Sequence, residues 1–271
     1  MVLPAPVLLL GCGRMGSAML SGWMSRGVAP DTILVVEPDP AAAGDAHRRH
    51  GVEVAKRVPP GLGPAVVVFA VKPQIMEDVA GSLGDALDRH PLVVSIAAGK
   101  TLAWFERHLG PHIPVVRTMP NTPAAIGRGI TAMVANSHVT HASRETATSL
   151  LTSIGETVWL DDESLMDAVT ALSGGGPAYV FLLIETLTRA GVANGLTEAV
   201  ASRLALHTVA GAGELALQAD ETPAELRRNV SSPGGTTLEA LAVLMAEDGM
   251  QPLFDRAVGA ATRRSRELGR Q

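Results

Sequence analysis

Uninterrupted apolar runs alternate with helix-like segments through the first 160 residues. Apolar runs without polar alternation are typical of strands that are buried on both faces of a parallel sheet. Strands interleaved with helices in this way predict an α/β fold with right-handed crossover connections. The runs rich in Val, Ile and Leu lie at 6–10, 32–37, 65–71, 92–97 and 114–119, and further strands are predicted at 129–135 and 156–160.

Beyond residue 161 the strand pattern ends and helical spacing takes over. This change predicts two domains: a Rossmann-type domain with a doubly wound, mostly parallel sheet over 1–160, and an all-α domain over 161–271. The helices are rich in Ala and poor in aromatic residues, so we expect their surplus apolar surface to be buried against a second subunit. The helical segments are 161–172, 177–193, 197–219, 222–229, 236–248 and 252–268.

Composition narrows the classes of protein. With 271 residues, 46% hydrophobic and 18% charged, the chain is globular. A net charge of −5 and few aromatic residues (4 Phe, 3 Trp, 1 Tyr) argue against a nucleic-acid partner. The longest unbroken apolar run, 65–71, is too short to span a bilayer, and the N-terminus has no basic segment before its apolar run. We therefore expect a soluble protein without a membrane partner. Cys12 is the single cysteine, which fits a cytoplasmic location.

A glycine-rich loop follows the first predicted strand and precedes a helix-like segment. It reads G-x-G-x-x-G, and Glu37 closes the second predicted strand about 20 residues later, a context that predicts a dinucleotide site. Gly11 would permit the tight turn, Gly13 would let a pyrophosphate approach the backbone, and Gly16 would let the helix pack closely. The alternative is a structural glycine turn without a nucleotide. The predicted binding residues here are Gly11, Cys12, Gly13, Arg14, Met15 and Gly16.

The carboxylate of Glu37 bears on the choice of cofactor. It can accept hydrogen bonds from the ribose hydroxyls of NAD, and it would repel the 2′-phosphate of NADP. Two alternatives stay open: Glu37 is only a solvent-facing strand end, or Arg48 and Arg49 compensate its charge, although a helix over 41–50 would expose them. The pattern predicts NADH or NADPH as cofactor, with NADH favoured.

Two more loops follow predicted strands, at the edge where doubly wound sheets bind ligands. Small residues in the second loop would let a nicotinamide ribose lie against the backbone, whereas Lys72 in the first is alternatively a solvated loop lysine. The predicted cofactor-binding residues in these loops are Ala70, Val71, Lys72, Pro73, Ala97, Ala98 and Gly99.

The stretch 229–241 reads NVSSPGGTTLEAL, with a Pro-Gly-Gly turn between hydroxyl residues at the start of a predicted helix. Such a loop would present backbone N–H groups without partners at the positive end of the helix dipole, where an anion can bind. The alternative is an ordinary helix N-cap.

Several separated motifs occur together in this chain. They are AVKPQ (70–74), SIAAG (95–99), VVRTMPNTPA (115–124), DAVTALSGGGPAYVF (167–181) and NVSSPGGTT (229–237). With them the chain resembles the pyrroline-5-carboxylate reductase family over nearly its whole length. The resemblance implies reduction of the cyclic imine L-1-pyrroline-5-carboxylate to L-proline by hydride transfer from NAD(P)H. It also implies a helical dimerisation domain and a homodimer, with assembly of dimers into larger rings such as a decamer.

The resemblance also implies roles for individual residues. The Thr237 hydroxyl would be the catalytic group that bonds to the ring nitrogen, and Asn229 would bind the nicotinamide carboxamide or alternatively cap its helix. The family commonly has Ser where this chain has Gly175, and Glu37 departs from members that use NADPH. The substrate carboxylate would be held by Ser232, Gly234, Gly235, Thr236 and Thr237, and the nicotinamide pocket would be lined by Met119, Pro120 and Asn121. No metal is predicted, because the histidines form no cluster with carboxylates or a thiol.

Two other functions compete with this interpretation. A dehydrogenase of the β-hydroxyacid type would place a lysine on the helical domain, but the three lysines, Lys56, Lys72 and Lys100, all lie in the first half. A regulatory NAD-sensing protein would have no need of a second anion-binding loop.

Overall fold

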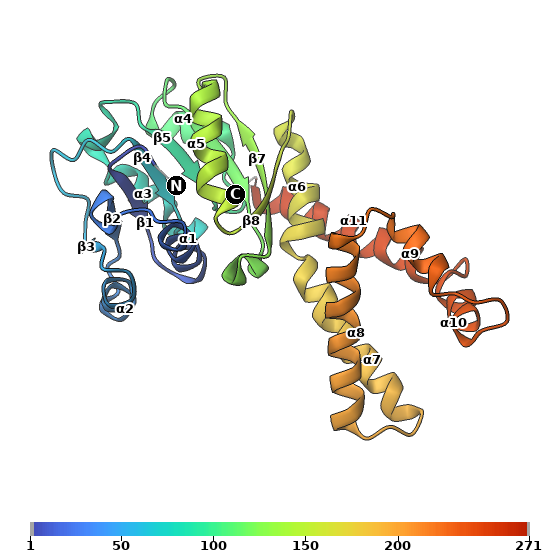
Figure 1. Ribbon diagram of the computed structural model, residues 1–271. Coiled ribbons are helices and arrows are strands. Elements are labelled where there is room, and N and C mark those ends of the chain that lie inside the picture. The colour runs from blue at the N-terminus through green and yellow to red at the C-terminus, as the bar shows by residue number, and fades with distance from the viewer. Residues whose placement is uncertain (1–2, 270–271) are drawn as a thin grey trace. The chain divides into compact units, whose positions relative to one another are not determined.

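The computed structural model describes residues 3–269, and its N-terminal part is built on one eight-stranded sheet (Figure 1). The strands lie side by side in the order β3-β2-β1-β4-β5-β6-β7-β8. The first six of this order are parallel, and β7 and β8 run in the opposite direction. The predicted doubly wound, mostly parallel sheet is confirmed. The strands are β1 (Val7–Leu10), β2 (Ile33–Val36), β3 (Glu53–Ala55), β4 (Val66–Phe69), β5 (Leu92–Ser95), β6 (Val115–Met119), β7 (Gly129–Ala135) and β8 (Gly155–Trp159).

Helices cover both faces of the sheet. Successive side chains of a strand point to opposite faces, so Leu9 of β1 belongs to the core that contains Trp23, whereas Leu8 belongs to the core that contains Phe105. Burial on both sides explains why the strands read as unbroken apolar runs. The first face carries α1 (Arg14–Ser25), α2 (Pro40–His50) and α5 (His141–Thr152), and the second carries α3 (Met76–Gly81) and α4 (Leu102–Leu109).

Strand β3 was not predicted by the apolar pattern. It has three residues, Glu53–Ala55, and pairs with β2 at one end of the sheet, with Val36 opposite Ala55. An edge strand this short, with a glutamate in it, gives no apolar run to detect. Its position decides which residues lie next to Glu37.

Contacts divide the described residues into two compact units. The sheet unit is the described part of Met1–Gly174 and of Ala261–Gln271, and the helical unit is Gly175–Ala260. The boundary therefore lies at 174/175, later than the domain boundary expected at 160/161. The residues between the two boundaries pack on the sheet unit: Arg117 Nη1 donates to Glu163 Oε1 (2.6 Å), and Met166 is buried beside β7. They form α6 (Met166–Val169) and a π-helical turn, Thr170–Gly174.

The helical unit exposes much apolar surface within one chain. Phe181, Leu217 and Val243 are all more than half exposed. The helical stretch Glu163–Ala193 is long and apolar enough to cross a membrane. One such helix in a chain is weak evidence for a membrane span, because core helices of other proteins pass the same test. A helix face that packs against another subunit has the same composition. The unit contains α7 (Gly176–Ala193), α8 (Glu198–Gln218), α9 (Pro223–Asn229), α10 (Thr236–Leu244) and the beginning of α11 (Met250–Gly269).

The tight approach of β7 and β8 at Gly129 and Gly155 predicts a strong effect of one substitution. Gly155 has φ 141°, and a Cβ there would lie 1.9 Å from Gly129 O. We expect Gly155→Ala to lower the free energy of unfolding by about 3 kcal/mol or more. Gly51→Ala is the control, because Gly51 has φ 69° but a Cβ would meet nothing, so it should cost only about 1–2 kcal/mol. Denaturant titration measures both, and equal losses would contradict the prediction.

Candidate cofactor and substrate sites

The glycine loop lies at the carboxyl edge of the sheet, by which we mean the end where β1, β2, β4 and β5 finish. Strand β1 has β2 on one side and β4 on the other, so the strand order reverses here and ligands of such folds bind at this point. Gly11 has φ 89°, and its N–H donates to Val36 O (2.9 Å). A Cβ on Gly11 would lie 2.7 Å from Val71 Cγ1, so the loop after β4 leaves room only for glycine.

The other two glycines of the loop differ in their surroundings. A Cβ on Gly16 would lie 2.3 Å from Gly11 O, so Gly16 is required for α1 to pack against the loop. A Cβ on Gly13 would meet no atom within 4 Å, and Gly13 is exposed at the N-cap of α1 without a side-chain cap. Protein packing therefore gives no reason for Gly13, whereas a pyrophosphate at the helix N-terminus needs this open space. The loop fits a dinucleotide on this ground.

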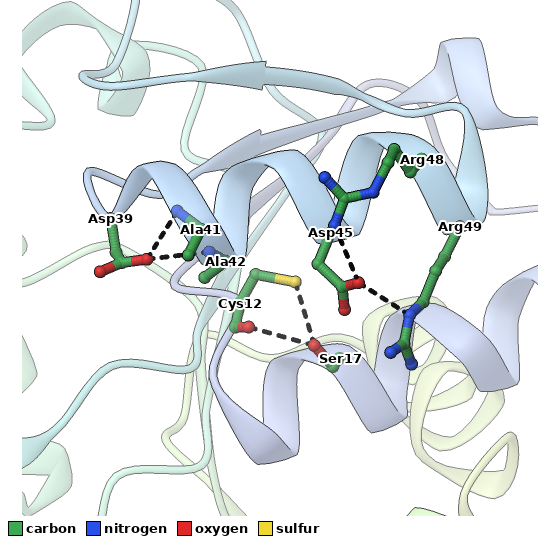
Figure 2. A network of polar contacts seen from close by, with 8 residues as sticks. All are labelled: Cys12, Ser17, Asp39, Ala41, Ala42, Asp45, Arg48 and Arg49. Atoms are coloured by element: carbon green, nitrogen blue, oxygen red, sulfur yellow. Dashed lines mark hydrogen bonds and ion pairs between the residues drawn. The ribbon is translucent and has the colours of Figure 1, made fainter.

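The buried Cys12 links the glycine loop to Ser17 in the first turns of α1 (Figure 2). Its Sγ lies 3.4 Å from Ser17 Oγ, and the Ser17 hydroxyl donates to Cys12 O (3.1 Å). Burial raises the pKa of the Cys12 thiol, and the negative charges of Glu37 and Asp45 act in the same direction, although the Ser17 hydrogen bond lowers it. The thiol therefore stays protonated and serves packing, and the main-chain groups of Cys12 bond within the protein, its N–H to Glu37 and its C=O to Ser17.

Glu37 is fixed beside the glycine loop. Its Oε2 accepts a hydrogen bond from the Cys12 N–H (2.9 Å), and its Oε1 accepts one from the Asp39 N–H (2.9 Å). Each carboxylate oxygen has a second lone pair, so ribose hydroxyls can still donate to this group. The predicted position of Glu37 at the end of β2 agrees with the structure.

Arg48 and Arg49 lie at the opposite end of α2 from Asp39 (Figure 2). Helix α2 begins just after Glu37, where Asp39 Oδ1 accepts from the N–H groups of Ala41 and Ala42 (2.9 and 2.8 Å). Both arginines lie in its last turn and pair with Asp45 (3.4 and 2.9 Å). Eleven helical residues span about 16 Å, so the structure places both arginines at the other end of the helix from Glu37 and in ion pairs with Asp45.

The loops after β4 and β5 reach the same edge. Ala70 N–H donates to Leu10 O (2.8 Å), which joins the first of these loops to the end of β1. Lys72 is exposed at the end of that loop. In the second loop Ala97 N–H donates to Ser95 Oγ (3.2 Å), and Gly99 has φ 78°. Every predicted cofactor residue except Asn229 therefore lies at the carboxyl edge.

The Pro-Gly-Gly loop, residues 232–237, belongs to the helical unit. Asn229 ends α9 and is exposed, and Thr236 begins α10. Gly235 N–H donates to Ser232 O (3.0 Å), so it closes the turn and is not a free donor, contrary to the expectation. Within the described residues, no acceptor is present for the N–H groups of Gly234, Thr236 and Thr237. Gly235 caps α10 with no side-chain hydrogen bond, which leaves the helix end open.

Residues at the end of β6 and just after it, Met119, Pro120 and Asn121, were predicted to line the nicotinamide pocket, and the structure shows protein contacts of two of them. Met119 ends β6, and a Cβ on Gly174 would lie 2.5 Å from its Cε. Asn121 Oδ1 accepts from Ile130 N–H (3.0 Å) and so fixes the start of β7. Sequence reasoning missed the buried Arg117, whose partner Glu163 also accepts from Leu102 N–H (2.8 Å). A lone arginine in an apolar strand is the signal that could have indicated a buried ion pair.

Comparison with known proteins decides the family. The family model for pyrroline-5-carboxylate reductase dimerisation matches residues 163–268, and a model described as NADP oxidoreductase, coenzyme F420-dependent, matches 6–99. The pyrroline-5-carboxylate reductase of Pseudomonas aeruginosa is 42% identical over 98% of this chain and 97% of its own length. The chain belongs to the pyrroline-5-carboxylate reductase family.

Further relatives and solved structures agree. The pyrroline-5-carboxylate reductase of Escherichia coli K12 is 36% identical, with 96% of this chain and 97% of that protein covered. The solved pyrroline-5-carboxylate reductase from Coxiella burnetii has a TM-score of 0.93 at 35% identity, covering 98% of both chains. The Plasmodium falciparum pyrroline carboxylate reductase structure, with NADP bound, has a TM-score of 0.81 at 28% identity, covering 99% and 100%.

Membership fixes the reaction and the kind of assembly. The chain is an NAD(P)H-dependent oxidoreductase acting on a C=N bond, and it reduces L-1-pyrroline-5-carboxylate to L-proline, the last step of proline biosynthesis. The dimerisation match indicates a homo-oligomer, and the exposed Phe181 and Leu217 lie inside the matched residues.

The contrast between Gly13 and Gly16 predicts two different variants. Gly13→Ala should change the free energy of unfolding by no more than about 1 kcal/mol and weaken NADH binding about tenfold or more. Gly16→Ala should lower both the free energy of unfolding and the affinity for NADH, because its Cβ would clash with Gly11 O. Denaturant titration and calorimetric titration with NADH measure the two effects. A Gly13→Ala protein that binds NADH as tightly as the wild type would exclude a ligand from this space.

Proposed function

We propose that this reductase uses NADH in preference to NADPH and that Glu37 makes the distinction. The single observation that supports the proposal is the position of the Glu37 carboxylate, held beside the glycine loop by the N–H groups of Cys12 and Asp39. A fixed carboxylate accepts hydrogen bonds from two ribose hydroxyls, and it raises the free energy of a 2′-phosphate placed at the same point. The reduced nicotinamide supplies the hydride when it is bound.

We propose that the Pro-Gly-Gly loop holds the substrate carboxylate. The N–H groups of Gly234, Thr236 and Thr237 and the Ser232 hydroxyl would donate to it, while Gly235 holds the turn through its bond to Ser232 O. The end of α10 adds about 0.3–1 kcal/mol of attraction for an anion, and up to about 2 kcal/mol in a partly buried site. An anchored carboxylate fixes the position of the neighbouring C=N bond.

The Thr237 hydroxyl is proposed as the group that bonds to the ring nitrogen. The imine binds protonated, the hydride adds to its carbon, and the electron pair of the C=N bond moves to nitrogen and neutralises the cation. No strong acid is required for this step, so the residues act by orienting the reactants and excluding water. Asn229 is proposed to bind the nicotinamide carboxamide.

We further propose a cytoplasmic homodimer that assembles into a decamer and has no nucleic-acid or membrane partner. The exposed apolar residues of the helical unit and the family match at 163–268 support the dimer. Because the two sets of site residues belong to different compact units, a dimer could pair the loop of one subunit with the carboxyl edge of the other. Subunits disabled separately at Gly16 and Thr237 would then regain activity when mixed.

Removal of the Glu37 charge should change cofactor preference. We expect Glu37→Ser to shift the ratio of kcat/KM for NADH to that for NADPH about tenfold toward NADPH, since the repulsion of the 2′-phosphate is lost. Glu53→Ser is the control. It removes an exposed carboxylate from the first residue of the neighbouring strand β3, which lies opposite Leu34 and away from the carboxyl edge. Steady-state kinetics with both cofactors measure the ratio. Equal shifts in the two variants, or none in Glu37→Ser, would count against the proposal.

Loss of the Thr237 hydroxyl should affect the imine and not the cofactor. We expect Thr237→Ala to lower kcat/KM for pyrroline-5-carboxylate about tenfold or more, with the Kd for NADH unchanged within about twofold. Thr146→Ala is the control, because that hydroxyl donates within α5, to Ala142 O (3.0 Å). An unchanged kcat/KM for Thr237→Ala would remove this residue from the mechanism.

A further inference from the structure

We infer that Lys56 and Arg57, the two residues after β3, bind the 2′-phosphate of NADPH and determine how far NADPH can replace NADH. The inference rests on the proposed cofactor discrimination at Glu37 and deepens it. It identifies the positive groups that oppose the carboxylate at the same edge of the sheet.

The register of β2 and β3 places the basic pair beside Glu37. The strands are parallel, with Leu34 opposite Glu53 and Val36 opposite Ala55. Glu37 N–H donates to Ala55 O (3.0 Å), which is the bond that ends the ladder. In the same register the next pair is Glu37 and Lys56, on strands about 4.8 Å apart. The chain after β3 therefore leaves the sheet at the carboxyl edge, next to the acid that discriminates the ribose.

Both basic side chains are available for a ligand. Lys56 and Arg57 are exposed, and within residues 3–269 neither has a hydrogen bond or an ion pair with another residue. Arg48 and Arg49, the other adjacent basic pair nearby in sequence, are both paired with Asp45. A phosphate near β3 would therefore meet two cations that need not break an ion pair to bind it.

Backbone donors at this corner of the sheet are already used. The N–H groups of Ala41 and Ala42, in the first turn of α2, donate to Asp39 Oδ1, so the start of α2 has no free site for an anion there. The Asp39 N–H donates to Glu37. A 2′-phosphate at the ends of β2 and β3 would thus be held by side chains, and the basic ones that directly follow these strands are Lys56 and Arg57.

The two opposing charges predict a graded preference. Glu37 disfavours the 2′-phosphate, and the basic pair lowers the cost of placing it there. The enzyme therefore accepts NADPH with reduced efficiency instead of rejecting it, and loss of the basic pair makes the preference for NADH sharper.

Binding of adenosine 2′,5′-bisphosphate tests the inference without catalysis. Calorimetry would compare the wild type, Lys56→Gln/Arg57→Gln and the control Arg48→Gln/Arg49→Gln, which removes the same charge at the far end of α2. We expect the first variant to bind this probe about tenfold more weakly and 5′-AMP unchanged within about twofold. Its kcat/KM should fall about tenfold with NADPH and stay constant with NADH. Added salt should weaken binding of the bisphosphate in the wild type more than in this variant.

Several results would overturn the inference. They are equal losses in the two double variants, an equal loss for 5′-AMP, unchanged binding of the bisphosphate, and no detectable binding of the bisphosphate by the wild type. Failure of the proposed function gives a different result. A wild type that favours NADPH over NADH would contradict that proposal, while selective loss of bisphosphate binding in Lys56→Gln/Arg57→Gln would still support the basic pair.

Discussion

The close approach of α1 to the loop at the end of β1 is the constraint on which the cofactor site depends. Gly16 has no room for a Cβ beside Gly11 O, and Gly11 has none beside Val71 and Ala70. These contacts direct the start of α1 toward the point where the strand order reverses, so free N–H groups and the positive end of the helix dipole meet a ligand there. Gly11 and Gly16 are packed against protein atoms and hold the loop in place, and this leaves free space next to Gly13 for a ligand.

The electrostatics at the carboxyl edge are coupled to this geometry. Glu37 gives the edge its negative charge, and the same carboxylate accepts the N–H of Cys12 from the glycine loop. A substitution that changes cofactor preference therefore also removes a bond that holds the loop, and weaker binding of both cofactors is the physical cost. Substitutions at Lys56 and Arg57 would change the preference between NADH and NADPH without this cost, because within the described residues these side chains make no hydrogen bond or ion pair with the glycine loop.

Most of the sheet could be predicted because strands buried on both faces are uniformly apolar, and the ends of parallel strands locate the binding loops. Strand β3 could not, because its three residues include Glu53 and carry no apolar run. The compact units divide at 174/175 although the dimerisation family model begins at 163, because composition and family membership report the type of element and not its packing. Residue 160 marks the end of the strands, yet Glu163 and Met166 pack against the sheet unit. The use of the Gly235 N–H inside its own turn likewise follows from local geometry that residue types do not reveal.

The two units obtain their stability from different sources. The sheet unit buries Trp23, Phe69 and Phe105 completely, which is enough apolar surface for an independent core. Among described residues of the helical unit, the buried apolar side chains are only Ala201 and Ala205, while Phe181 and Leu217 face outward. This exposed apolar surface lies within the dimerisation match at 163–268, so association with another subunit would add to the stability of the helical unit. The Pro-Gly-Gly loop lies in this unit, so the part of the enzyme proposed to hold the substrate is also the part that association would stabilise.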